Sequence, residues 1–140
     1  MLSIQTPFTD RLSAVAAGMR VDPSMLAAAK VQAIASGKSP GAFVRLRDTD
    51  SLGLVVRFHE AAMSVFPAHE YPLVVLTSIG EMEMPLDEVS PSGLVEVIAR
   101  LYDDTEVRVR PVQTGDTWAL ATADGRFVPP RSVEDLLPTH

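Results

Sequence analysis

The sequence predicts a single α+β domain over residues 1–140, with a helical part at about residues 1–66 and a sheet-containing part at about 67–140. Apolar residues recur at helical spacing in the first half of the chain. The last third instead alternates apolar and polar residues and is divided by glycine-containing turns. A chain of 140 residues that is 46% hydrophobic is long enough to bury a core. We therefore expect an N-terminal segment of two to three helices packed with a C-terminal antiparallel β-meander and one amphipathic helix.

Two helices are expected near the N-terminus. The segment Phe8–Met19 has apolar residues at helical spacing. A second helix begins at Asp22 and Pro23, a capping residue followed by proline at the first helical position, and ends near residue 36, before Gly37. The segment Ala42–Arg47 is compatible with a short helix or a strand.

The segment Leu52–Phe66 also has two interpretations. Its apolar residues fit one face of a helix, which we favour. In its first part, however, apolar residues recur at every second position, which favours a strand paired with Val44 and Leu46, although Val55 interrupts the alternation.

In the second half, the run Tyr71–Ile79 is rich in β-branched residues and predicts a buried strand. A helix is expected from Ser90 to about Leu101, because its apolar residues are spaced i, i+3, i+4 and i+7. The meander follows between residues 107 and 128, with a type I′ hairpin turn at Asp124 and Gly125. A final turn is expected over residues 132–137.

Residues 12–33 have the apolar spacing of a helix-turn-helix, with a Val-Asp-Pro-Ser turn at 21–24. The second helix of such a motif reads DNA through Arg, Lys, Asn or Gln side chains at base edges. Here that helix offers Met25, Ala28 and Ala29, and its one cation is Lys30. We therefore expect a plain helical hairpin, and DNA is not the expected partner.

Two His-Glu pairs are the only cluster of residue types suited to metal binding or acid–base catalysis, namely His59, Glu60, His69 and Glu70. Ten residues separate the histidines, whereas a shared helix face requires a spacing of four. We expect His59 to be a hydrogen-bonded core residue. The sequence thus predicts no catalytic residues, no metal and no cofactor.

Charge is distributed unevenly along the chain. The formal net charge is −6, with +2 in residues 1–50 and −8 in residues 51–140. An acidic chain is repelled by nucleic acid, so the acidic part favours a protein partner with a basic or amphipathic segment. The chain has no cysteine and no apolar run of membrane-spanning length, which predicts a cytoplasmic protein without a membrane partner. Ten Arg against two Lys is typical of a GC-rich, bacterial genome.

The expected partner-binding surface is a Met-rich acidic segment that we place in an exposed loop between a strand and a helix. It comprises Glu81, Met82, Glu83, Met84, Asp87 and Glu88. Methionine side chains adapt to irregular partner surfaces, and clustered acids attract a cationic ligand. The sequence therefore predicts a small, acidic, non-enzymatic protein-binding module that acts as an adaptor, chaperone-like factor or regulator.

The expected order of helix, strands, helix, strands and helix in an acidic chain loosely resembles the layout of bacterial secretion chaperones. This resemblance rests on layout, without a shared motif, and implies a protein-binding role. Two alternatives stay open: a DNA-binding regulator that uses residues 12–33, and a metal-dependent enzyme that uses His59, Glu60, His69 and Glu70. A homodimer is also open.

Overall fold

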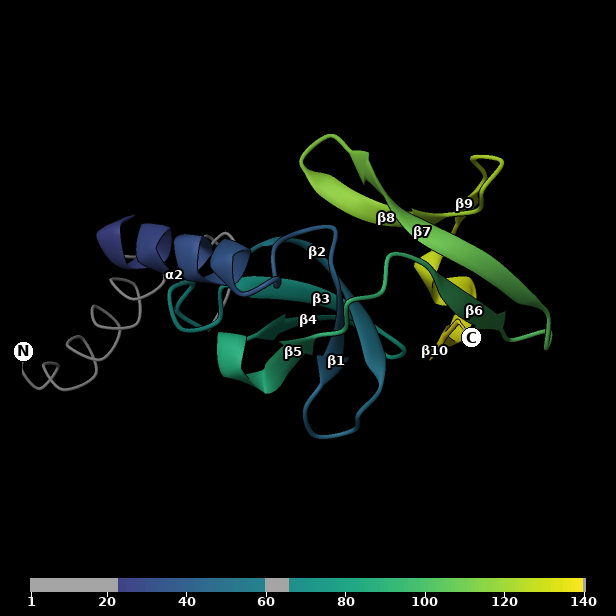
Figure 1. Ribbon diagram of the computed structural model, residues 1–140, viewed down its shortest axis with the longest axis horizontal. Coiled ribbons are helices and arrows are strands. Elements are labelled where there is room, and N and C mark those ends of the chain that lie inside the picture. The colour runs from purple at the N-terminus through teal and green to yellow at the C-terminus, as the bar shows by residue number, and fades with distance from the viewer. Residues whose placement is uncertain (1–22, 60–65, 140) are drawn as a thin grey trace, which may run out of the picture.

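A computed structural model describes residues 23–59 and 66–139. Within these residues the chain forms ten strands, in two five-stranded antiparallel sheets, and one α-helix (Figure 1). The fold is mostly β, so the predicted α+β arrangement with a multi-helix N-terminal part is wrong. The predicted helix at Phe8–Met19 lies outside the described residues.

The first sheet has the strand order β4-β3-β2-β1-β5. Its elements are β1 (Phe43–Leu46), β2 (Leu52–Phe58), β3 (Leu73–Thr77), β4 (Gly80–Met84), the 3-10 turn η2 (Leu86–Glu88) and β5 (Val89–Pro91). The second sheet has the order β10-β6-β7-β8-β9. Its elements are β6 (Val97–Leu101), β7 (Glu106–Thr114), β8 (Thr117–Ala121), β9 (Phe127–Val128), the 3-10 turn η3 (Pro130–Ser132) and β10 (Val133–Pro138).

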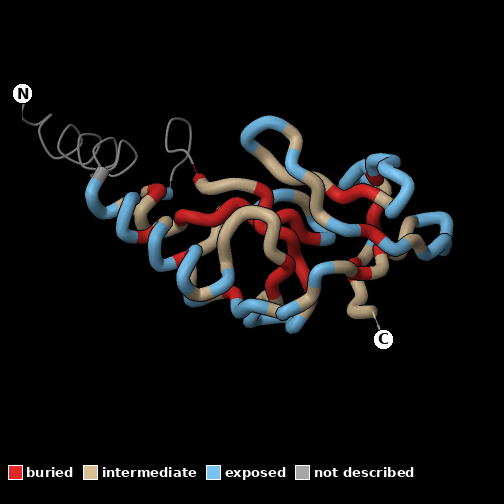
Figure 2. The backbone as a smooth tube through the Cα atoms, turned by 45° about the horizontal axis from the view of Figure 1, so that its top comes forward, coloured by how far each residue is buried: buried red, intermediate tan, exposed pale blue. Residues whose placement is uncertain are grey.

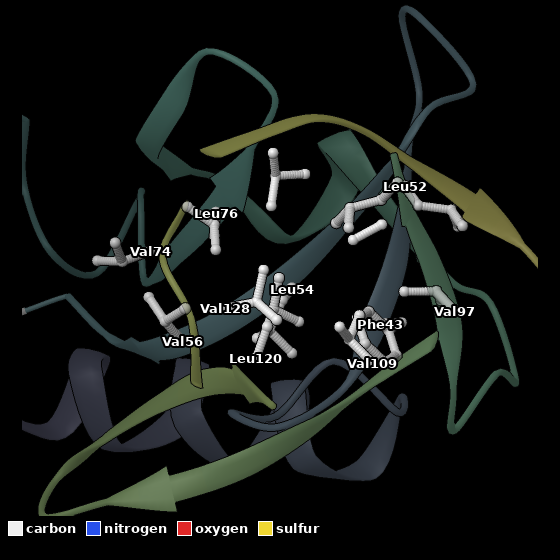
Figure 3. Close-up of a cluster of buried hydrophobic side chains, with 13 residues drawn as sticks. Phe43, Leu52, Leu54, Val56, Val74, Leu76, Val97, Val109, Leu120 and Val128 are labelled. Atoms are coloured by element: carbon white, nitrogen blue, oxygen red, sulfur yellow. The ribbon is translucent and has the colours of Figure 1, made fainter. Parts of the chain in front are cut away.

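The main apolar core lies between the two sheets, where side chains from both point toward one another (Figure 3). Its buried members are Phe43, Leu52, Leu54, Val56, Val74, Leu76, Val97, Ala99, Val109, Leu120, Val128, Val133 and Leu136. Trp118 packs against this core and is partly buried. We call the side of the first sheet that contributes to this core its sandwich face.

A second apolar cluster covers the opposite side of the first sheet, which we call its helix face. There Ala33 of the helix α2 (Pro23–Ala35) packs among Val44, Val55, Leu73 and Val75. The buried stripe of α2 carries small residues, so the helix backbone approaches the sheet closely, while its other side is exposed (Figure 2). The molecule is thus layered as helix, first sheet and second sheet.

The helix α2 follows its sequence signals. Proline occupies the first helical position, and Gly37 has a φ of 76° directly after the last turn. The Lys38 N–H donates to the Ala33 carbonyl over 2.8 Å, which closes the helix end. The prediction of a helix that begins at Pro23 and ends before Gly37 is confirmed.

The helix expected over Leu52–Phe66 is wrong for its described part, where β2 occupies Leu52–Phe58. Its first three residues pair with β1 as the alternative interpretation expected, with Phe43 opposite Leu54. Val55 interrupts the alternation because β2 is buried on both faces, and Val55 packs on the helix face. The segment left open at Ala42–Arg47 contains β1.

The helix expected from Ser90 to Leu101 is also wrong, because β5 and β6 occupy this segment. The expected final turn consists of η3 followed by β10, which pairs with β6. The layout that resembles secretion chaperones is therefore not found.

The strand predicted at Tyr71–Ile79 is confirmed as β3, and the meander as β7, β8 and β9. At its second turn Gly125 alone of the Asp124–Gly125 pair has a positive φ, so the predicted type I′ turn is wrong.

Candidate functional site

The six residues of the predicted partner-binding segment lie at one edge of the first sheet. Four of them, Glu81 to Met84, form most of β4, and the remaining two belong to η2. The expected exposed loop is thus an edge strand followed by a 3-10 turn. This difference matters because a strand sends alternate side chains to opposite faces.

The cross-strand register separates the acids from the methionines. Glu81 and Glu83 lie opposite Leu76 and Val74, which belong to the core on the sandwich face. Met82 and Met84 lie opposite Val75 and Leu73 of the helix-face cluster. The edge strand therefore presents a carboxylate row on one face and a methionine row on the other.

A pocket of about 490 Å³ opens beside the carboxylate row. It is lined by Arg57, His59, Phe66, Val74, Glu81, Met82 and Glu83. An Arg57 Nη2 atom lies 2.6 Å from Oε1 of Glu81, and the two side chains are about 40% exposed. Sequence reasoning did not select Arg57 or Phe66 for this site.

A bulge in β2 brings Arg57 to this pocket. Val55 lies opposite Val75, but Arg57 lies opposite the adjacent residue Val74, so one residue of β2 is extra. A bulge of this kind re-aims the following side chains. Arg57 consequently shares the sandwich face with Val74, whereas regular alternation from Val55 would have sent it to the helix face.

His59 is a buried member of the same pocket. Its side chain is 3% exposed, and Nδ1 lies 2.8 Å from the Tyr71 carbonyl, to which it donates. Nε2 lies 2.7 Å from Oε2 of Glu83.

The four residues of the predicted His-Glu site are not brought together as a metal centre. His59 is engaged as described, Glu70 is exposed, and Glu60 lies outside the described residues. His69 has a buried Nδ1 that finds no hydrogen-bond partner among the described groups. Within residues 23–59 and 66–139, no three His, Asp or Glu side chains gather as metal ligands.

Substitution of the buried His59 by alanine is expected to lower the free energy of unfolding by about 1–3 kcal/mol, because the Tyr71 carbonyl loses its donor. Urea unfolding measures this change, and His69→Ala is the comparison, with a smaller expected loss. Elemental analysis of the parent protein is expected to find no stoichiometric metal. One metal per chain that disappears in His59→Ala would assign a ligand role to His59 instead.

A second pocket, of about 220 Å³, opens beside the methionine row on the helix face. Its apolar lining consists of Leu46, Ile79, Met82 and Met84, and its polar lining of Arg47, Asp48, Thr49, Ser51, Thr77, Ser78 and Glu88. Ile79 is 81% exposed at the tip of the turn between β3 and β4. The methionine row thus borders a small apolar hollow with a polar rim.

Two cations lie beside η2, where Asp87 and Glu88 are found. Lys38 Nζ donates to the Leu86 carbonyl over 2.7 Å, and Arg47 Nη1 donates to the Asp87 carbonyl over 2.9 Å. Asp87 itself is exposed. These contacts fix the backbone of η2 and partly offset the acids around it.

Charge along the chain is nevertheless one-sided in this region. Between Arg57 and Arg100 the sequence contains seven Asp or Glu residues and no Lys or Arg. On the second sheet, in contrast, arginines are interspersed among the acids, and Arg100 lies 3.4 Å from a carboxylate oxygen of Glu134 and 3.5 Å from one of Asp135. Hydrogen bonds from Arg108 and then Arg110 lower the pKa of the partly exposed Glu96 carboxyl. The stretch of sequence without Lys or Arg therefore contains both β4 and η2.

The residues of the DNA-binding alternative are only partly described, because residues 12–22 lie outside the described ranges. The Nζ atom of Lys30 lies 5.5 Å from the centre of the Phe58 ring. Arg45 Nη1 lies 4.0 Å from a carboxylate oxygen of Asp50. Met25 is exposed on α2.

No family model matches the chain, and no match is found among curated proteins or solved structures. No helix in the described ranges has both the length and the hydrophobicity that a membrane span requires.

Proposed function

We propose that this protein is a non-enzymatic protein-binding module whose contact surface is β4 with the two pockets beside it. One observation carries the proposal: the edge strand β4 of the first sheet separates a charged pocket on one face of the sheet from an apolar pocket on the other face. Interfaces combine an apolar centre with a polar rim, and a strand of alternating Glu and Met supplies both within five residues.

The proposed partner contributes a basic or amphipathic segment. The support is the run of seven acids without Lys or Arg between Arg57 and Arg100, which includes all four acids of the predicted segment. Glu81 already contacts Arg57, so the partner's cation would approach a carboxylate that is held in place. A preorganised carboxylate loses less side-chain freedom on binding. The proposal keeps the cytoplasmic location expected from the cysteine-free sequence.

A charge-neutralised variant tests this proposal. The change is Glu81→Gln, Glu83→Gln, Asp87→Asn and Glu88→Gln in one chain. The probe is a set of peptides selected against the parent protein from a displayed random ten-residue library. We expect the selected peptides to be rich in Lys and Arg, to associate more slowly with the variant, and to show a flatter salt dependence, because rim charges act mainly on association.

A matched control removes four exposed acids from the second sheet by Asp104→Asn, Glu106→Gln, Asp116→Asn and Glu134→Gln. Both variants change the net charge equally, so a general field effect would slow them alike. Peptides without basic residues, or equal rates and salt slopes for the parent and the first variant, would contradict the proposed surface. Urea unfolding confirms that both variants retain the fold.

A further inference from the structure

The apolar pocket on the helix face lies beyond the part of the first sheet that α2 covers. Ala33 of α2 packs in one cluster with Val44 and Val75. Side chains alternate along a strand, so Leu46 and Thr77, two residues further along β1 and β3, lie on the same face. Both line the pocket, and all its lining residues lie between positions 46 and 88. The pocket therefore continues the helix-face cluster toward the turns β1–β2 and β3–β4.

The pocket is remote from both breaks in the described chain. The break after His59 lies near the beginning of β3, because the His59 N–H donates to the carbonyl of Pro72, the residue before that strand. The pocket lies at the opposite end of β3, beside Thr77. The other break precedes α2, at the end of the helix that is remote from β1 (Figure 1). The carboxylate row on the sandwich face does not contribute to the pocket lining.

The size and the lining of this pocket favour one aromatic side chain. An apolar cavity of about 150 Å³ holds a benzene ring, and this pocket has about 220 Å³. Its lining includes Met82 and Met84, and methionine sulfur makes favourable contacts with aromatic rings. Ile79 at its edge is 81% exposed, so an entering ring would bury apolar surface that is now in water.

The charges on the rim of the pocket favour a cation beside that ring. Asp48, in the turn β1–β2, and Glu88, at the end of η2, have no ion pair among the described residues. Arg47 is the one cation of the lining, and its guanidinium already donates to the Asp87 carbonyl. With two carboxylates against one guanidinium, the rim is negatively charged and complements a cationic group of a partner.

We infer that this pocket anchors one aromatic side chain of the partner protein, and that a Lys or Arg next to the aromatic residue pairs with Asp48 and Glu88. This inference rests on the proposed function, because the pocket belongs to the proposed contact surface, and it names the residue types that the partner places there. Aromatic residues that fill pockets are among those that carry most of the binding energy of protein interfaces.

Three pentapeptides with blocked ends provide the first test. One has the sequence Lys-Lys-Phe-Lys-Lys, and the others carry Leu or Ala at the centre. Titration of the full chain, followed by two-dimensional ¹H–¹⁵N NMR, measures affinity and locates the contact. We expect the Phe peptide to bind roughly tenfold or more tightly than the Ala peptide, because its ring leaves water, and the Leu peptide to lie between them. The largest shifts are expected in residues 47–51 and 77–79.

The outcomes separate this inference from the proposed function. If all three peptides bind equally well, and the variant that lacks four acids binds them more weakly, the proposed function stands and the aromatic anchor is wrong. If none of them binds, this inference fails, and the selected ten-residue peptides decide the proposed function alone. A Leu peptide that binds as tightly as the Phe peptide, or shifts that lie away from the pocket, would also overturn the anchor.

A pair of protein variants tests the apolar contact from the other side. Ile79→Ser removes an apolar side chain from the edge of the pocket. Val95→Ser is the matched control, because Val95 is also 81% exposed and does not line the pocket. We expect Ile79→Ser to weaken binding of the Phe peptide roughly threefold or more and to leave the Ala peptide within about twofold, whereas Val95→Ser changes neither. Equal effects of the two variants on the Phe peptide would contradict the anchor.

The charge pairing is tested at Asp48, which lies outside the segment of six residues predicted from the sequence. We expect Asp48→Asn to weaken binding of the Phe peptide about two- to fivefold, as is typical of an exposed ion pair, and to leave binding of Ser-Ser-Phe-Ser-Ser unchanged. Asp104→Asn, in the turn β6–β7, is the control for net charge. Equal binding of Lys-Lys-Phe-Lys-Lys by the two variants would overturn the pairing. NMR spectra of the free proteins verify that all variants are folded.

Discussion

Replacement of Phe43 by alanine is expected to lower the free energy of unfolding by about 3–5 kcal/mol, a range typical of buried Phe truncations. Phe43 is 2% exposed and belongs to β1, next to the central strand β2 of the first sheet. It points into the core between the sheets, near Val109 and Val97 of the second sheet (Figure 3). The cavity left by the removed ring would lie between the two sheets, so a rearrangement of one sheet alone would not fill it.

The measurement is urea unfolding followed by circular dichroism, with the midpoint and the slope fitted separately. Phe127→Ala is the matched control, because the Phe127 side chain on β9 is 62% exposed and its loss is expected to change stability by no more than about 0.5 kcal/mol. Equal midpoints for the two variants would contradict the position of Phe43 in the core.

Replacement of Trp118 by alanine is expected to cost roughly 3 kcal/mol or more. Trp118 is partly buried on β8 and packs against the core between the sheets. Its indole also contacts the segment before β1: a Cβ added at Gly41 would lie 3.0 Å from the ring. Gly41, whose φ is 94°, in turn donates its N–H to the Val55 carbonyl. The indole therefore joins the second sheet to the loop between α2 and β1.

Thermal melting by circular dichroism is the suitable measurement, because Trp118 is the only tryptophan and its removal eliminates the fluorescence probe. Trp118→Phe is expected to lose less, since a phenyl ring keeps part of the contact with Gly41 and the core. A Trp118→Ala variant that melts with the parent would show that the ring contributes little to packing, and would make it a candidate for a binding surface.

The helix expected over residues 90–101 shows how two periodicities coexist in one sequence. It was predicted from four residues at helical spacing: Leu94, Val97, Ile98 and Leu101. The same segment also satisfies a period of two, because Val97, Ala99 and Leu101 all face the core. Ala99 is too small to signal burial, and the strand is decided by pairing with β7, where Val109 lies opposite Val97. Such distant partners are not visible in a local pattern.

The proposed contact surface keeps the six residues selected from the sequence, but their geometry differs from the exposed loop that the sequence predicted. Glu81-Met82-Glu83-Met84 alternates polar and apolar residues, which is the pattern of a half-exposed strand. Glutamate is uncommon in strands, so the acids favoured a loop, and pairing with β3 overrides that preference. Arg57 escaped notice because its position depends on a bulge in β2. No local sequence pattern indicates that bulge.

The separation of the two sheets along the chain has a consequence for biosynthesis. Every strand of the first sheet comes from residues 43–91, and every strand of the second from residues 97–138. On the ribosome the first sheet can pair completely while its sandwich face is still uncovered. At typical elongation rates the second sheet is completed roughly two to ten seconds later. During that interval a first sheet that has already paired presents the apolar residues of its sandwich face to solvent, and exposed apolar surface of this kind promotes aggregation.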